Sequence, residues 1–309
     1  MNWFWAAIAA LVLIAAWPVI AEAMRRPMNS AARKLAPGQF ATLSKGVTHY
    51  RWRGPEEGPL VVCVHGLTTA SLVWDSIAQH LAEQGYRVLT YDHFGRGFSD
   101  RPKVLQDAEF FLRHLNELLD HEGVDQKFTL IGYSMGGAVS TCYADTYPER
   151  LNHLVLLAAA GVMRPSGGLI SAVLGVPLLG DWLMKMRYPS ILRKGILAER
   201  SLPSSVPGLN DAQLAELDYR GFLPSVRASV QGLMTYPFEE AHHHIAETGL
   251  PVLAIWGGED DVVPVSSNDI LAQWNPGARQ EIVASAGHGL PYTHTADVMA
   301  HLGPWLETR

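Results

Sequence analysis

The sequence is poor in cysteine and has no strong excess of charge. Only 2 of its 309 residues are cysteine, Cys63 in an apolar run and Cys142 in a helix-like stretch. Such cysteines are packed thiols more often than a disulfide, so they do not indicate an oxidising compartment. The net charge is −6, from 24 basic and 30 acidic residues, and the basic residues form no stripe, which argues against nucleic-acid binding. Internal repeats and low-complexity tracts are also missing, and the length suits one large domain with an insertion.

The sequence also lacks a convincing set of metal ligands. His242, His243 and His244 are adjacent, but neighbouring side chains on a helix point in different directions and rarely share an ion. No group of cysteines or carboxylates completes a site around them. We therefore expect neither a metal nor another cofactor.

One long uncharged stretch lies at the N-terminus, between Trp3 and Ala21. Its length is close to the minimum for a membrane-spanning helix, and its three tryptophans lie near its ends, as interfacial anchors do. Residues 1–24 are therefore predicted to form a transmembrane anchor, so a membrane is an expected partner. Basic residues follow the stretch at positions 25, 26, 33 and 34. The positive-inside rule then places the rest of the chain in the cytoplasm.

Two alternatives exist for this N-terminal segment. Ala-Glu-Ala at 21–23 resembles a signal-peptidase site, although no Lys or Arg precedes the apolar stretch as in most signal peptides. Cleavage there would give a secreted or periplasmic protein. The second alternative is that translation begins at Met24 or Met28.

The sequence Gly-Tyr-Ser-Met-Gly at 132–136 is the most informative motif. It follows the apolar run at 128–131 and precedes a helix-like stretch at 137–144. A serine between a buried strand and a helix is typical of a nucleophile elbow, a strained turn that exposes the hydroxyl above the sheet. Gly132 and Gly136 leave the room that the close passage of strand and helix requires. Ser134 is therefore the predicted nucleophile.

A serine hydroxyl needs a base to remove its proton and an acid to orient that base. In hydrolases with such an elbow, the acid and then the histidine follow the serine along the chain. His288 lies in a loop of small residues after the strand-like segment 280–283, and we predict it to be the base. His294 and His301 lie on a predicted helix at 293–307, where a packed or solvated position is the simpler interpretation.

The acid is expected at the end of a strand between Ser134 and His288. The apolar strand predicted at 252–256 leads into a turn that contains Glu259, Asp260 and Asp261. Asp260 has the usual position for the acid, and Asp261 is the second choice. The turn after the preceding strand contains no carboxylate.

The oxyanion of a tetrahedral intermediate is usually stabilised by two backbone N–H groups. Met135, which follows the nucleophile, supplies the first. Leu67 is the predicted second donor, because it follows Gly66 in the loop after the buried strand at 60–64. His65 precedes the predicted acid in the chain, so we expect it to brace this loop rather than act as a base.

Together these motifs resemble the α/β-hydrolase superfamily, in its branch of serine esterases and lipases, including monoacylglycerol lipases. The resemblance rests on His65-Gly66, on Asp-His-Phe-Gly-Arg-Gly-Phe-Ser at 92–99, and on Ser134, Asp260 and His288. It covers the chain from about residue 43 to the C-terminus. It implies that residues 92–99 shape the floor of the site, and a serine nucleophile argues against dehalogenase or epoxide hydrolase activity.

The predicted fold is α/β, with a mostly parallel central sheet covered by helices on both faces. The core is expected at 40–160 and 246–309, and the segment 161–245 is too long for an ordinary connection, so it is predicted to form a helical cap. The apolar stretch at 168–184 is interpreted either as a lid that faces acyl chains or as helices that pack on the domain.

The predicted activity is cleavage of a small carboxylic ester through an acyl-enzyme, and analogy with the anchor and cap favours a lipid-like ester. The same triad also cleaves thioesters, lactones and carbon–carbon bonds of diketones, because fold does not fix function. Carbon–carbon hydrolases hold a substrate carboxylate, for which the candidate residues are Arg164, Arg187, Arg193 and Arg220. A non-catalytic, membrane-tethered binding protein is the alternative from another class.

Overall fold

An eight-stranded sheet forms the centre of the computed structural model, which describes residues 2–34, 36–163 and 177–307. The strand order is β1-β2-β4-β3-β5-β6-β7-β8. β1 and β2 form an antiparallel hairpin that pairs antiparallel with β4, and every further pairing is parallel. The strands are β1 Gln39–Leu43, β2 Gly46–Arg53, β3 Leu60–Val64, β4 Arg87–Tyr91, β5 Phe128–Tyr133, β6 Leu151–Leu157, β7 Val252–Gly257 and β8 Arg279–Val283.

Helices cover both faces of this sheet because side chains of the buried strands alternate between two apolar clusters. Val62 and Val64 of β3 belong to one cluster, with α4, α5 and α10. Val61 and Cys63 of the same strand belong to the other, with α3, α12 and α13. The covering helices are α3 Asp75–Glu83, α4 Ala108–His121, α5 Met135–Thr146, α10 Phe238–Thr248, α11 Ser267–Trp274, α12 Leu290–Thr293 and α13 Thr295–Leu306.

The predicted fold is thus confirmed, and most predicted elements lie within a few residues of their observed bounds. The hairpin β1–β2 was not predicted as strands. Its polar residues interrupt the apolar pattern because they pair with carboxylates of neighbouring segments: His49 contacts Asp92, and Arg51 and Arg53 pair with Asp75. Cys63 and Cys142 are both buried free thiols.

Three helices of the inserted segment form a separate small cluster. They are α7 Pro177–Glu199, α8 Leu209–Glu216 and α9 Phe222–Leu233. Met184, Leu217, Phe222 and Val226 bury their side chains against one another. Residues 164–176, which include most of the predicted apolar lid and Arg164, lie outside the described residues.

The predicted cap boundary at residue 245 falls inside α10. This helix packs against α5, and Phe238 and Ile245 belong to the apolar cluster of the sheet. α10 therefore belongs to the layer that covers the sheet. In the described part of the insertion, α7, α8 and α9 surround an apolar cluster of their own.

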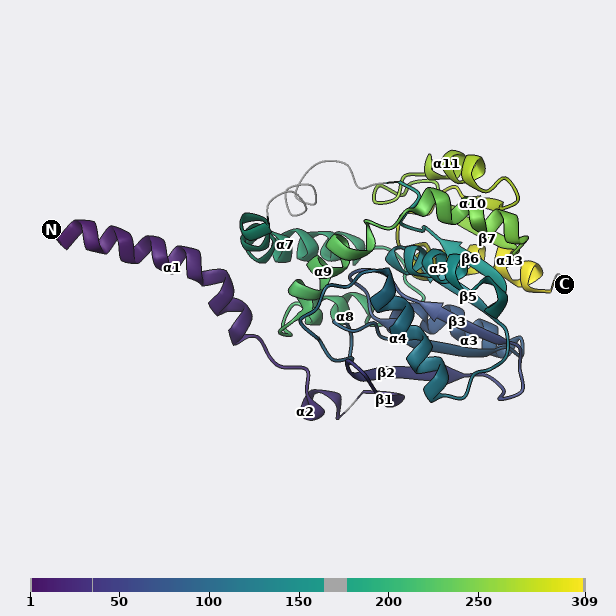
Figure 1. Cartoon of the computed structure of the whole chain (residues 1–309), viewed down its shortest axis with the longest axis horizontal. Coiled ribbons are helices and arrows are strands. Elements are labelled where there is room, and N and C mark those ends of the chain that lie inside the picture. Colours follow the sequence, from purple (N-terminus) through teal and green to yellow (C-terminus); the bar gives the residue numbers. More distant parts are fainter. Residues whose placement is uncertain (1, 35, 164–176, 308–309) are drawn as a thin grey trace.

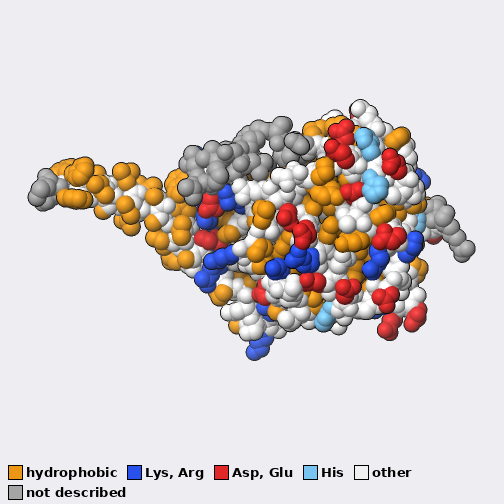
Figure 2. Space-filling model, viewed as in Figure 1, with side chains coloured by type: hydrophobic (Ala, Val, Ile, Leu, Met, Phe, Trp, Pro, Cys, Tyr) orange, Lys and Arg blue, Asp and Glu red, His pale blue; other side chains and the backbone are white. Residues whose placement is uncertain are grey.

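The N-terminal helix α1, Asn2–Met24, extends away from the rest of the molecule (Figure 1). Its stretch from Trp3 to Met24 is long and apolar enough to cross a membrane, and only 6% of its most apolar window is buried. Apolar side chains cover the projecting helix in Figure 2. A signal sequence has the same length and composition.

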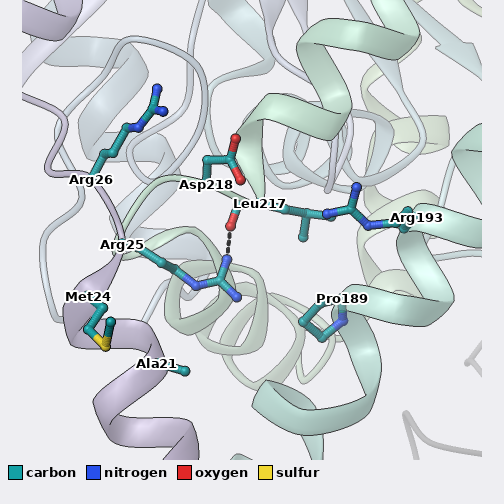
Figure 3. A pocket seen from close by; sticks show the side chains of 8 residues that line it. All are labelled: Ala21, Met24, Arg25, Arg26, Pro189, Arg193, Leu217 and Asp218. Atoms are coloured by element: carbon teal, nitrogen blue, oxygen red, sulfur yellow. Dashed lines mark hydrogen bonds between the residues drawn. The ribbon is translucent and has the colours of Figure 1, made fainter.

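The C-terminal end of α1 is attached to α8 and α9. The Gly221 N–H donates to the buried carboxylate of Glu22 at 2.6 Å, and Arg25 pairs with the same carboxylate at 3.1 Å. The Arg26 N–H donates to the Asp218 carbonyl at 2.9 Å. Figure 3 shows the pocket beside this junction, where Arg25 also donates to the Leu217 carbonyl; its lining residues are Ala21, Met24, Arg25, Arg26, Pro189, Arg193, Leu217 and Asp218.

Candidate active site

Ser134 lies on the turn that joins β5 to α5. Its φ of 54° and ψ of −120° are a strained conformation for a residue with a side chain. The turn is held by hydrogen bonds of 3.0 Å from the Ser134 N–H to the Leu157 carbonyl and of 2.9 Å from the Ala160 N–H to the Ser134 carbonyl. Ser134 as a whole is half-buried.

Both glycines of the motif are required by close contacts. A Cβ atom on Gly132 would lie 2.3 Å from the Gly136 carbonyl oxygen, and one on Gly136 would lie 2.0 Å from the Val64 carbonyl oxygen. Backbone atoms of a sheet and a helix cannot move apart at low cost, so only glycine fits at either position.

The structure brings Ser134, His288 and Asp260 into one hydrogen-bonded series. The Nε2 atom of His288 lies 2.9 Å from the Ser134 Oγ, and its Nδ1 atom lies 2.8 Å from Asp260 Oδ2. The other carboxylate oxygen of Asp260 accepts hydrogen bonds of 2.8 Å from the N–H groups of Val262 and Val263. Asp260 is therefore fixed by the backbone and is in a position to orient the imidazole.

The other acids and histidines considered from the sequence lie away from this series. Glu259 and Asp261 are exposed. His294 contacts the hydroxyl groups of Ser285 and Thr293, and His301 lies 3.6 Å from Glu281. Of the three acids in the turn after β7, Asp260 is the one that contacts His288.

Leu67 and Met135 lie on the two segments that were predicted to supply the oxyanion donors. Met135 is the first residue of α5, so its N–H belongs to the unpaired donors of a helix N-terminus. Within the described part of the chain, the Leu67 N–H has no hydrogen-bond acceptor. Both groups are therefore available to an oxygen bound above Ser134.

His65 braces the loop that carries Leu67. The His93 N–H donates to His65 Nε2 at 2.9 Å, which leaves the proton of the neutral ring on Nδ1, 2.8 Å from the Gly66 carbonyl. Burial lowers the pKa of His65 to about 4, so the ring is neutral at pH 7. The carbonyl that it binds belongs to the peptide unit of the Leu67 N–H, so His65 fixes the direction of that donor.

Asp92 organises the turn at 92–99 beneath the site. Its carboxylate accepts hydrogen bonds from the N–H groups of Ser71 at 2.7 Å and Phe98 at 2.9 Å, and it pairs with His49 at 2.8 Å. Burial opposes ionisation of Asp92, but the hydrogen bond and charge of His49 lower its pKa well below the usual value. Asp92 does not belong to the hydrogen-bonded series of Ser134, and it stabilises the turn.

Two side chains near the site were not singled out from the sequence. Arg96, inside the turn at 92–99, donates to the Leu67 carbonyl at 2.9 Å. Tyr292 follows the His288 loop and donates to Glu199 at the end of α7 at 2.8 Å. Their sequence positions carry no motif for these roles, because each contact joins residues that are distant along the chain.

The side chains of the three adjacent histidines at 242–244 do not point to a common site. His242 is buried, His243 is exposed, and His244 pairs with Asp145 at 2.7 Å. Among the described residues, no group of three or more His, Cys, Asp or Glu side chains is placed to hold a metal ion. Arg187, Arg193 and Arg220 are exposed on the insertion.

The sequence model of the α/β hydrolase fold family matches residues 59–295 of this chain. The chain belongs to this family. The match spans the elbow, the turn with Asp260 and the loop with His288. Members of the α/β hydrolase fold family include hydrolases of several kinds of bond.

Three known proteins illustrate the similarity. A 2-hydroxymuconate semialdehyde hydrolase of Pseudomonas sp. (strain CF600) is 29% identical over 80% of this chain and 86% of its own length. The esterase of Exiguobacterium antarcticum has a TM-score of 0.73 at 21% identity, covering 88% of this chain and all of its own. A membrane phospholipase A described as a bacterial virulence factor has a TM-score of 0.70 at 21% identity, covering 99% of this chain and 98% of its own.

Proposed function

We propose that this protein is a serine hydrolase that cleaves carboxylic esters through an acyl-enzyme. The observation that carries the proposal is the series of hydrogen bonds that joins Ser134, His288 and Asp260, with distances of 2.9 and 2.8 Å. A serine in this arrangement has a base for its proton and an acid that orients the base. The proposed reaction needs no cofactor.

In the proposed reaction, Ser134 Oγ attacks the ester carbonyl carbon while His288 Nε2 takes the hydroxyl proton. The N–H groups of Leu67 and Met135 bind the oxyanion that forms. When the carbon–oxygen bond of the ester breaks, His288 gives its proton to the leaving alcohol. A water molecule, deprotonated by His288, then attacks the acyl group, releases the carboxylic acid and restores the Ser134 hydroxyl.

A lipid-like ester, such as a monoacylglycerol, is the proposed substrate class. Support comes from the apolar helix α1, whose end is attached to α9 through Glu22 and Gly221. On the insertion, Met186, Ile191 and Leu197 of α7 are exposed apolar side chains. A hydrolase tethered beside a bilayer meets esters that are dissolved in it.

We propose that α1 is a retained single-pass anchor with the hydrolase on the cytoplasmic side. The basic residues that follow the span support this orientation. Cleavage of α1 as a signal peptide, giving a secreted or periplasmic protein, is the alternative. N-terminal sequencing of the membrane fraction separates the two, since a retained anchor leaves Trp3 on the mature chain.

Carbon–carbon bond hydrolysis is the second candidate. The semialdehyde hydrolase that is 29% identical to this chain favours it. Among the arginines considered for a substrate carboxylate, Arg187, Arg193 and Arg220 are exposed, whereas Arg164 lies outside the described residues. The ester reaction is therefore preferred. Thioester and lactone cleavage would use the same catalytic groups, so the same test covers them. If the protein is a non-catalytic binding protein, none of these substrates is turned over.

The test compares substrates under one set of conditions. Full-length protein in detergent is given 4-nitrophenyl esters from acetyl to palmitoyl, a thioester, a lactone and a 2-hydroxy-6-oxo-dienoate. We expect ester turnover to exceed carbon–carbon cleavage and to be greatest at medium or long acyl chains. A higher kcat/KM for the dienoate would overturn the ester assignment in favour of the second candidate.

A further inference from the structure

We propose that Arg96 is a positioning residue that fixes the oxyanion loop and connects it to helix α9 of the insertion. This inference rests on the proposed ester hydrolysis, because it concerns the same site. It assigns a function to a side chain that lies in the turn at 92–99 and has no place in the series of Ser134, His288 and Asp260.

Arg96 is fully buried, and its hydrogen-bond acceptors among the described residues are all neutral. Its Nε–H donates to the Leu67 carbonyl at 2.9 Å, and one terminal nitrogen donates to Gln106 Oε1 at 2.7 Å and to the Phe94 carbonyl at 3.2 Å. The second terminal nitrogen donates to the Ser229 hydroxyl at 2.8 Å. No carboxylate among the described residues lies within ion-pair distance.

A buried charge of this kind lowers stability, so its presence calls for a functional explanation. Burying a charge without a direct ion pair costs several kcal/mol in general, and a neutral side chain of similar volume packs at lower cost. The Glu216 carboxylate attracts the Arg96 guanidinium from beyond ion-pair distance, and Arg101 repels it. Burial lowers the pKa of Arg96 to about 9, so the guanidinium is still protonated at pH 7. Its planar fork can bind several acceptors in fixed directions, which a lysine ammonium cannot do in the same way.

The contact with Leu67 reaches the oxyanion loop directly. The Leu67 carbonyl belongs to the peptide unit on one side of that residue, and the Gly66 carbonyl to the unit on the other. Arg96 binds the first at 2.9 Å, and His65 binds the second at 2.8 Å. Both peptide planes that flank Leu67 are therefore held by buried side chains, and no residue that the structure describes accepts a hydrogen bond from the Leu67 N–H. An oxyanion donor is effective only when it is oriented before the reaction.

The contact with Ser229 reaches the insertion. Ser229 lies on α9, and its hydroxyl also donates to Gln106 Oε1 at 2.5 Å, so Arg96, Gln106 and Ser229 form a closed triangle of hydrogen bonds. A second observation supports the same connection, because the Leu67 side chain packs against the apolar cluster of α7, α8 and α9. A displacement of α9 would therefore change the position of the oxyanion donor through Arg96.

The test measures kcat and KM for 4-nitrophenyl butyrate in the full-length protein and in variants Arg96→Met, Arg96→Lys and Ser229→Ala. Removal of an oxyanion donor lowers kcat roughly 10²–10³-fold, and a donor that points in the wrong direction lowers kcat by a smaller factor. We expect Arg96→Met to lower kcat by about 10- to 100-fold, with KM changed by less than about 3-fold. Arg96→Lys should recover part of the loss, and Ser229→Ala should show a smaller loss of the same kind.

A boronic acid separates positioning from general stability. Its adduct with a serine places an oxygen in the oxyanion hole, so its inhibition constant should rise by the same factor as kcat falls. The matched control is Arg150→Met, because Arg150 also donates to a backbone carbonyl, that of Val124 at 2.8 Å, away from Ser134. We expect this variant to lose thermal stability and to keep kcat and boronic acid affinity.

Two outcomes would overturn the proposal. The first is a folded Arg96→Met variant whose kcat and boronic acid affinity equal those of the wild type. The second is an unchanged kcat in Ser229→Ala, and this outcome decides the question if both Arg96 variants fail to fold. Failure of the proposed ester hydrolysis looks different, since turnover would then be absent in the wild type or unchanged in Ser134→Ala.

Discussion

His288 bridges Ser134 and Asp260, although 154 positions of the chain separate His288 from the serine that it contacts at 2.9 Å. Parallel strands explain how this happens. β5 ends at Tyr133, directly before Ser134, and β7 ends before Asp260; the carboxyl ends of parallel strands meet at one edge of the sheet. His288 follows β8, which pairs with β7, so its loop reaches the same edge.

The first prediction concerns the acid. Asp260→Asn should lower kcat by roughly 10⁴-fold, because an amide cannot hold the imidazole in the required tautomer. Asp261→Asn is the matched control: its side chain is exposed, and we expect kcat within about 2-fold of the wild type. Steady-state rates on one soluble ester measure both. The reverse order would place the acid at Asp261.

The second prediction concerns the elbow. Gly132→Ala places a methyl group 2.3 Å from the Gly136 carbonyl oxygen, so we expect a loss of about 1–3 kcal/mol in the free energy of unfolding and a loss of activity. Gly195→Ala on α7 is the control, because a Cβ atom at this position has no neighbouring atom within 4 Å. Alanine inside a helix is more stable than glycine by about 1 kcal/mol, so we expect no loss of stability. Chemical denaturation of each variant gives these values. Equal stability of Gly132→Ala and the wild type would refute the close contact.

The third prediction concerns stability at acid pH. The pKa of Asp92 is lowered in the folded protein, so its stabilising effect is complete above the ordinary value of 3.8 and is lost as pH falls below it. Asp92→Asn should cost about 3–5 kcal/mol at pH 7, because His49 and two N–H groups lose a charged partner. The difference between wild type and variant should shrink as the pH falls below about 4. A difference that stays constant with pH would show that Asp92 is not ionised in the fold.

The fourth prediction concerns the N-terminal helix. Removal of residues 1–20 should release the protein from membranes and leave the hydrolysis of a soluble ester nearly unchanged. Removal of residues 1–24 also deletes Glu22, whose carboxylate accepts the Gly221 N–H at the start of α9 at 2.6 Å, so we expect lower thermal stability as well. Flotation with vesicles, melting curves and ester rates compare the two truncations. Membrane binding by the chain without residues 1–20 would exclude α1 as the anchor.

The sheet and the residues at its carboxyl edge could be predicted from the sequence because both depend on local patterns. Continuous apolar runs indicated the buried parallel strands, and the turn residues after them gave Ser134, Asp260 and His288 as candidates, which the structure brings together. The hairpin β1–β2 was missed because His49, Arg51 and Arg53 are placed there by partners far away in the sequence.

The roles of Arg96 and Glu22 could not be predicted for the same physical reason. Arg96 contacts Ser229, 133 positions along the chain, and Glu22 contacts Gly221, 199 positions away. Such contacts arise only when the insertion folds against the core and the N-terminal helix. A single sequence shows a charged residue in a turn and another near an apolar stretch, and neither pattern indicates a partner.

Labelling with a fluorophosphonate most directly tests the claim that Ser134 is an activated nucleophile. Full-length wild type, Ser134→Ala and His288→Ala are treated with the reagent, and the modified residue is located by mass spectrometry. We expect stoichiometric modification at Ser134 in the wild type, much slower modification in His288→Ala and none in Ser134→Ala, which should also lose ester turnover by at least about 10⁴-fold. Folded wild-type protein that is not labelled, or that is labelled at another serine, would contradict the proposed mechanism.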